Sequence, residues 1–224
     1  MSRERLRRMQ TVLDRRQPDM TVIMAGVHKE HNLSAVLRTA DAVGVLEVHA
    51  MGAHSVPALK RTAHAGVGKR VQLRHEPRIA DGCEKLRQAG FRILATALTP
   101  QALDFRELDY TGPFALMLGA ELEGVPEEGL AQADAIITIP MMGLSDSLNV
   151  SVAAAVILYE AQRQRLQAGL YATRRLQPEV CAQLLFEWLH PRMARFCRQG
   201  GYPYPGLDED GDLLHAPGEA AAQE

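Results

Sequence analysis

Residues 114–126 read FALMLGAELEGVP and show most directly how this chain folds. Phe114–Leu118 is a continuous apolar run of strand length, as expected for a parallel strand that is covered on both faces. Gly119 and Gly124 then allow a ligand to approach the backbone closely, and Pro126 suits the first turn of a helix. The stretch therefore predicts a buried strand that ends in a ligand-binding loop.

The rest of the chain alternates between strand-like and helix-like patterns. Further strand-like runs are at 21–24, 45–50, 71–73, 91–97 and 135–139. Helical patterns are at 32–43, about 57–65, 78–89, 126–133 and about 149–167. Such alternation predicts an α/β fold, in which helices cover a parallel sheet.

Charge and composition divide the chain into four expected segments. These are a basic N-terminal helix (1–18), the α/β core (19–168), a C-terminal helical extension (169–205) and an acidic, flexible tail (206–224). The tail has six acidic residues and no Lys or Arg, so residues 1–205 hold 25 basic against 21 acidic residues. Of those 25, 21 are arginines, whose planar group matches phosphate. This composition favours nucleic acid as a partner, and Arg7, Arg8, Arg15, Arg16, Arg192 and Arg195 of the two helical segments are the candidate contacts.

Several protein classes are disfavoured by the sequence. No apolar run reaches the roughly 18–20 residues that span a membrane, and the basic N-terminus has no apolar stretch of a signal peptide behind it. The three cysteines lie far apart and read as free thiols of a cytoplasmic protein. His28 and His31 have no further ligand at a recognisable spacing, so no metal site is expected. A nicotinamide-dependent dehydrogenase is disfavoured because G-x-G-x-x-G is absent.

Two more stretches hold candidate functional residues. In 31–44, HNLSAVLRTADAVG, Asn32 is placed to cap a helix, while Arg38 falls opposite most of its apolar stripe. In 139–155, IPMMGLSDSLNVSVAAA, Ser147 and Asn149 bracket the N-terminus of a helix, where free N–H groups favour anions. Taken singly, each of these residues could be no more than a cap or a solvated charge.

Taken together and in this order, the three stretches resemble the SpoU (TrmH-type) branch of the SPOUT methyltransferases. The matching patterns are N-x-x-A-x-x-R-T-A-x-A-x-G at 32–44, L-G-x-E-x-x-G at 118–124 and I-P-M…S-L-N-V-S-x-A at 139–153. Segments 15–19, 158–165 and 201–205 extend the likeness to the tRNA-modifying members over nearly the whole chain. The resemblance implies a parallel-sheet SPOUT fold with a C-terminal deep trefoil knot, flanked by N- and C-terminal helices. It also implies a homodimer whose active sites lie at the subunit interface.

The implied reaction transfers a methyl group from S-adenosylmethionine to the 2′-hydroxyl of a guanosine in tRNA, at position 18 of the D-loop. The resemblance implies that Thr96, Gly119, Ile139 and Leu148 bind the cofactor. It assigns catalysis to Asn32, Arg38, Glu121, Ser147 and Asn149. A guanidinium stays protonated at neutral pH, so we expect Arg38 to act as a cation beside the developing alkoxide, oriented by Asn32.

Two alternatives stay open at this point. One is 2′-O-methylation of another RNA nucleotide, in ribosomal RNA or elsewhere in tRNA. The other is an RNA-binding module that has lost catalysis, although the motif residues are intact.

Overall fold

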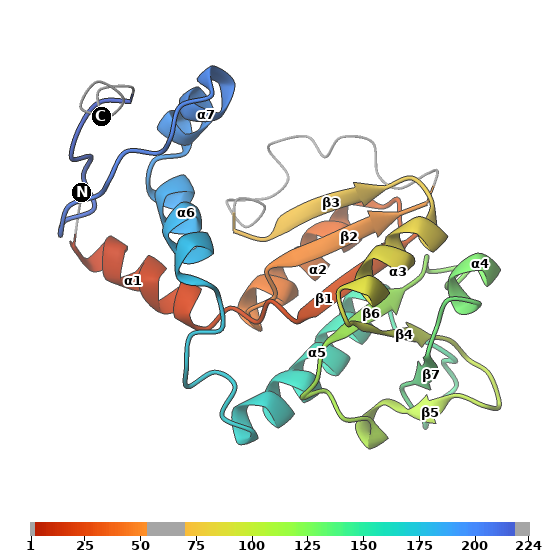
Figure 1. Cartoon of the computed structure of the whole chain (residues 1–224). Helices are drawn as coiled ribbons and strands as arrows, with labels where there is room; N and C mark the ends of the chain where they lie inside the picture. Colours follow the sequence, from red (N-terminus) through yellow and green to blue (C-terminus); the bar gives the residue numbers. More distant parts are fainter. Residues whose placement is uncertain (1–2, 53–69, 218–224) are drawn as a thin grey trace. The chain divides into compact units, whose positions relative to one another are not determined.

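The computed structural model describes residues 3–52 and 70–217, and its centre is a seven-stranded parallel sheet (Figure 1). The strands are β1 (Met20–Ala25), β2 (Glu47–Met51), β3 (Gln72–Glu76), β4 (Arg92–Thr96), β5 (Leu103–Asp104), β6 (Phe114–Leu118) and β7 (Ala135–Thr138). Their order is β3-β2-β1-β6-β4-β7-β5, and every pairing is parallel. The α/β class is confirmed, while the trefoil knot stays a prediction because strand order does not describe threading.

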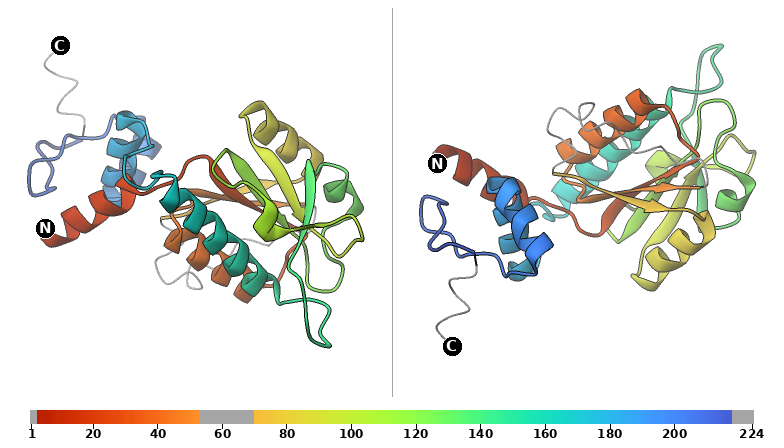
Figure 2. Two further views of the ribbon diagram at one scale, coloured as in Figure 1. Left: turned by 90° about the horizontal axis from the view of Figure 1, so that it is seen from below. Right: turned by 90° about the horizontal axis from the view of Figure 1, so that it is seen from above.

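Helices cover both faces of the sheet. The helices are α1 (Arg3–Asp14), α2 (Glu30–Ala42), α3 (Ile79–Gln88), α4 (Glu127–Leu130), α5 (Val150–Gln167), α6 (Pro178–Leu189) and α7 (Pro191–Gly200). In Figure 2, α2 and α5 lie side by side on one face and α3 lies on the other. Successive β1 side chains alternate accordingly: Val22 joins the core beneath α2 and α5, and Ile23 joins the core beneath α3.

The chain divides into two compact units. One is Gln17–Ala172, which holds the sheet; the other combines residues 1–16 with 173–224. In the second unit α1 packs on α6, and α6 packs on α7. Residues 207–213 of the acidic segment form a turn there, with an antiparallel bridge between Leu207 and Leu213. None of the described helices is both long and apolar enough to cross a membrane.

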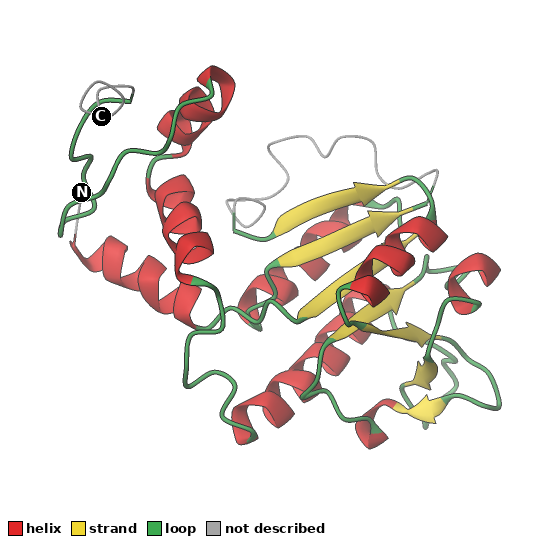
Figure 3. Cartoon of the chain, viewed as in Figure 1, coloured by secondary structure: helices red, strands yellow, loops and turns green. Residues whose placement is uncertain are grey.

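Most predicted elements are present, with some corrections (Figure 3). The predicted C-terminal helical extension (169–205) contains two helices, because Pro191 lacks an N–H and begins a new helix. The pattern at 126–133 gives only the four-residue α4, and the two-residue β5 was not predicted. The helix expected at about 57–65 lies outside the described residues.

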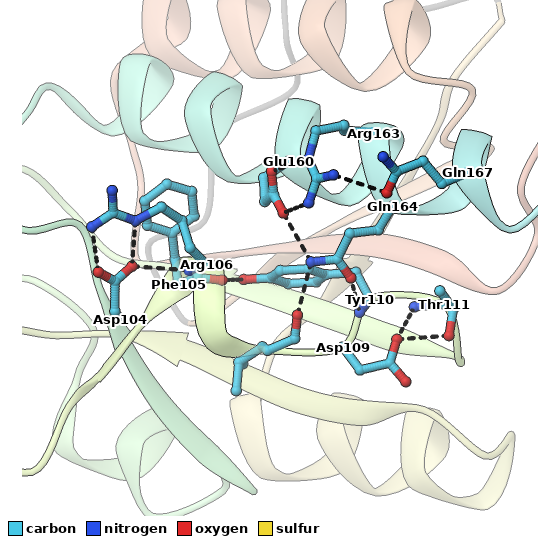
Figure 4. Close-up of polar contacts among 11 residues, drawn as sticks. Asp104, Phe105, Arg106, Asp109, Tyr110, Thr111, Glu160, Arg163, Gln164 and Gln167 are labelled. Atoms are coloured by element: carbon cyan, nitrogen blue, oxygen red, sulfur yellow. Dashed lines mark hydrogen bonds and ion pairs between the residues drawn. The ribbon is translucent and has the colours of Figure 1, made fainter.

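The C-terminal half of α5 is fixed to the segment that leads into β6 (Figure 4). The side chain of Gln164 donates to Leu108 O (2.9 Å) and accepts from Tyr110 N (2.9 Å). The Tyr110 hydroxyl donates to Phe105 O at 2.7 Å, so this segment is closed on itself. The two hydrogen bonds of Gln164 therefore fix α5 against the segment at residues 108–110.

Arg165 is buried one residue further along α5. Its guanidinium donates to Asp19 Oδ1 (2.7 Å), Gln17 Oε1 (3.0 Å), Tyr110 O (2.9 Å) and Gly112 O (2.8 Å). A buried guanidinium is tolerated only when its donors are paired in this way. These bonds join α5 to the chain before β1 and before β6, and α5 begins at the site described next.

Candidate active site

A cavity of about 450 Å³ opens at the carboxyl ends of β4, β6 and β7. In open parallel sheets this edge is where ligands bind. Residues of 96–99, 118–125 and 137–148 line the cavity, so three separated loops meet there. All four predicted cofactor residues are among the lining residues: Thr96, Gly119, Ile139 and Leu148.

The loop after β6 folds back on itself because residue 119 is a glycine. Ala120 N donates to Gly124 O (3.1 Å) and Gly124 N donates to Ala120 O (2.8 Å). Gly124 has a φ of 68°, which favours glycine. A Cβ on Gly119 would lie 1.9 Å from the carbonyl carbon of Gly124. No side chain fits there, so this tight loop needs the glycine pair that the sequence shows.

The Glu121 carboxylate gathers the polar residues of the motifs. Its Oε1 accepts from Asn32 Nδ2 (2.8 Å) and from Asn149 Nδ2 (2.7 Å). Asn149 Nδ2 is also 3.3 Å from Asn32 Oδ1. The other oxygen of Glu121 pairs with the ammonium group of Lys29. Three predicted catalytic residues are thus in direct contact, although they come from different parts of the chain.

Two causes keep Glu121 ionised. The hydrogen bond from Lys29 lowers the pKa of the carboxyl, and the hydrogen bond from Asn32 lowers it further. Both donors stabilise the charged form. An ionised carboxylate can accept several N–H groups at once, so the cluster needs Glu121 in this state.

Asn149 has a second task at the start of α5. Its Oδ1 accepts from Ser151 N (2.8 Å), so Asn149 is the N-cap of this helix. The amide's two ends therefore anchor the helix and hold Glu121. Asn32, by contrast, is not the cap that was expected: α2 begins at Glu30, and Asn32 is buried in its first turn. Its side chain binds the Glu121 carboxylate instead of capping its own helix.

Ser147 and Arg38 lie apart from this cluster. Ser147 is exposed and lines the 450 Å³ cavity. Arg38 is exposed on α2, beside a second hollow of about 580 Å³ that His31 and Ser34 also line. The expected orientation of Arg38 by Asn32 is not observed. Six residues of helix separate them by about 9 Å and about 240° of rotation, so their side chains point in different directions.

Comparison with known proteins agrees with this geometry. The family described as SpoU rRNA Methylase matches residues 19–159, and its C-terminal companion family matches residues 163–216. The chain belongs to the SpoU methylase family.

A tRNA (guanosine(18)-2′-O)-methyltransferase from Thermus thermophilus is 56% identical over 83% of this chain and 95% of its own length. The Escherichia coli protein of the same name is 47% identical over 95% of this chain and 94% of its own length. Among solved structures, the SpoU methyltransferase AviRb from Streptomyces viridochromogenes, in complex with the cofactor AdoMet, superimposes with a TM-score of 0.60. The two proteins are 26% identical, and the match covers 69% of this chain and 62% of the AviRb chain.

Five of the six arginines expected to contact RNA in this SpoU protein are exposed: Arg7, Arg8, Arg15, Arg192 and Arg195. Arg16 is the exception. Its side chain is fully buried, and its guanidinium lies 5.4 Å from the centre of the Trp188 ring. The expectation that Arg16 contacts RNA is therefore wrong for this structure, because a phosphate cannot reach a buried guanidinium.

Lys29 was not predicted from the sequence to belong to the site. It precedes the first turn of α2, three residues before Asn32, and this spacing puts both side chains on one side of the helix start. The three-residue spacing from Asn32 could have indicated that Lys29 belongs to the site, but a lysine next to a helix is most often solvated. The partner carboxylate is 92 residues away, and only the fold reveals it.

We expect Lys29→Met to lower methyl-transfer turnover about two- to fivefold at neutral pH, since the ion pair is partly exposed. Loss of Lys29 raises the pKa of Glu121. Glu121 holds its donors only in the ionised form, so activity is lost as the pH falls through its pKa. The acid limb of the pH–rate profile of Lys29→Met therefore moves to higher pH. Lys29→Arg should restore the wild-type profile, and superimposable profiles for Lys29→Met and wild type would contradict the role.

Proposed function

We propose that this protein transfers a methyl group from S-adenosylmethionine to the ribose 2′-hydroxyl of guanosine 18 in the D-loop of tRNA. One observation carries the proposal: the Glu121 cluster lies at the edge of a cavity formed by three loops at the carboxyl ends of β4, β6 and β7. The tRNA substrate is supported by the names of the Thermus and Escherichia relatives.

The cavity fits the cofactor. Its volume of about 450 Å³ lies in the range of small-molecule sites, roughly 300–1,000 Å³. Leu118, Ile139 and Leu148 offer apolar contacts to a nucleoside, and the loop at Gly119 offers backbone polar groups. When bound, S-adenosylmethionine supplies the electrophilic methyl group. The residues of the chain hold it, exclude water and align the ribose oxygen with it.

Glu121 and Ser147 line this site, and Asn32 and Asn149 hold the Glu121 carboxylate from outside the cavity. Their role is to fix the loops at the start of α5, so that the cavity and the ribose are held in one geometry. Arg38 is the cation that stabilises negative charge on the ribose oxygen as the hydroxyl proton passes to water.

A homodimer would complete the site. One face of α5 exposes Val152, Val156 and Tyr159, which are spaced for a single helix side. Leu122, Met142 and Leu144 are also exposed on the loops around the cavity. Apolar side chains gathered in this way mark protein interfaces. Since Arg38 lies outside its own subunit's cavity, the partner subunit would bring an arginine to each site.

The unit that contains α1, α6 and α7 would bind tRNA through its exposed arginines, mainly by phosphate contacts that do not depend on sequence. A tRNA substrate supports a cytoplasmic location.

The test is to incubate the protein with labelled S-adenosylmethionine and unmodified tRNA, digest the RNA and locate the methyl group by mass spectrometry. The expected product carries it on the ribose of guanosine 18. A tRNA with 2′-deoxyguanosine at that position is the matched control and should accept none. Absence of transfer, or a methyl group on another nucleotide or in ribosomal RNA, would contradict the proposal.

A further inference from the structure

The outer side of α7 is both basic and aromatic. Arg192, Arg195 and Phe196 follow the i, i+3, i+4 spacing of one helix face, and all three are exposed. The opposite face buries Ala194 and Cys197. The Phe196 side chain is 53% exposed, which is unusual for a large ring and is not explained by the packing of α7 on α6.

A second exposed ring lies against Phe196. Tyr202 is 45% exposed and its ring stacks on Phe196, with centroids 5.8 Å apart and planes 18° apart. Gly201 ends α7 with a φ of 69°, and Tyr202 N donates back to Cys197 O at 2.9 Å. A Cβ on Gly200 would lie 2.3 Å from the Tyr202 ring. The helix end is therefore shaped to hold this ring in place.

The segment after Tyr202 is anchored as well. Tyr204 stacks on Phe186 at 4.5 Å, and its hydroxyl donates to Glu187 Oε1 at 2.8 Å. Arg198 donates to the same carboxylate oxygen at 2.8 Å. This inner pair of rings is structural, since Phe186 is buried. The outer pair, Phe196 and Tyr202, is also stacked but is exposed.

We propose that Phe196 and Tyr202 form a platform on which an unstacked base of the RNA substrate stacks, while Arg192 and Arg195 bind the adjacent phosphates. The inference rests on the proposed function for the identity of the RNA. Proteins bind single-stranded segments by this combination of aromatic rings and cationic side chains. A preformed ring pair loses little conformational entropy when a base is added.

Charge favours RNA over a second copy of this chain as the occupant. α7 contains Arg192, Arg195 and Arg198 and no acidic residue. Among the described residues, Arg192 and Arg195 have no ion-pair partner. Pairing this face with itself would bring like charges together, whereas a phosphate backbone complements them.

The experiment compares tRNA affinity across a salt titration. The double variant Phe196→Leu/Tyr202→Leu keeps the apolar contact but removes both π faces, and is expected to bind tRNA roughly tenfold more weakly with an unchanged salt slope. Arg192→Ala and Arg195→Ala should each reduce the slope by about 1. The matched control, Phe196→Tyr/Tyr202→Phe, keeps both rings and should bind like wild type. Thermal unfolding of each variant verifies that α7 stays folded.

Two results would overturn the platform. One is wild-type affinity of the leucine double variant for tRNA. The other is a change in its sedimentation, which would assign the rings to contact with a second copy. A further arm uses a single-stranded oligonucleotide and a duplex of the same length, and only the single strand should distinguish the leucine variant from wild type. Methyl transfer by the wild-type protein is read separately, so failure of the proposed reaction is not confused with failure of the platform.

Discussion

Gly119→Ala is expected to lower the affinity for S-adenosylmethionine by about 100-fold or more. The new Cβ would lie 1.9 Å from the carbonyl carbon of Gly124 and 2.0 Å from Val125 N. Both are backbone atoms, so no side-chain rotation can relieve the overlap. The turn between Ala120 and Gly124 must open, and it forms part of the wall of the cavity. Isothermal titration calorimetry with the cofactor measures the effect.

Gly143→Ala is the matched control for this change. It lies on the neighbouring loop before α5, and a Cβ built there meets nothing within 4 Å. We expect near-normal cofactor affinity for this variant. Thermal unfolding of both proteins separates a local change of the loop from loss of the fold. Tight binding by a folded Gly119→Ala protein would show that the cofactor does not depend on this loop.

The centre of the sheet could be predicted from sequence because β1, β4 and β6 are apolar runs that are buried on both faces and show no polar alternation. The outer strands β2 and β3 contain polar residues that are partly exposed, so their pattern is weaker. All six predicted runs contain strands, whereas Leu103–Asp104 is too short to give a pattern. The motif at 118–124 likewise located the cavity, since ligands bind at the carboxyl ends of parallel strands and this loop follows one.

The polar cluster could not be derived from local pattern. Asn32 and Glu121 are 89 residues apart, and Asn32 and Asn149 are 117 apart. Their pairing depends on the sheet order, which brings separate loops to one edge. The sequence pattern predicted that Asn32 caps a helix and that Arg16 contacts RNA. In the structure Asn32 binds the Glu121 carboxylate and Arg16 lies against the Trp188 ring.

Arg38→Ala is expected to reduce turnover on the order of 100-fold or more, with cofactor binding retained. Arg38 does not line the 450 Å³ cavity, so its loss leaves the cofactor contacts intact. It lies on the exposed side of α2, which packs beside α5 and the apolar side chains proposed to form the dimer. Single-turnover methyl transfer and cofactor titration on the purified variant measure both quantities. Near-normal turnover would remove Arg38 from the mechanism.

Mixed dimers test where Arg38 acts. If each site combines the cavity of one subunit with Arg38 of its partner, a dimer of one Arg38→Ala subunit and one Gly119→Ala subunit keeps one complete site. Such a dimer, isolated through two different affinity tags, should regain about half of the wild-type activity although both parent dimers are nearly inactive. If cavity and arginine belong to the same subunit, neither half of the mixed dimer is complete and no activity returns. We expect the activity to return because Arg38 is exposed and lies outside the cavity of its own chain, where it can serve the cavity of the partner subunit.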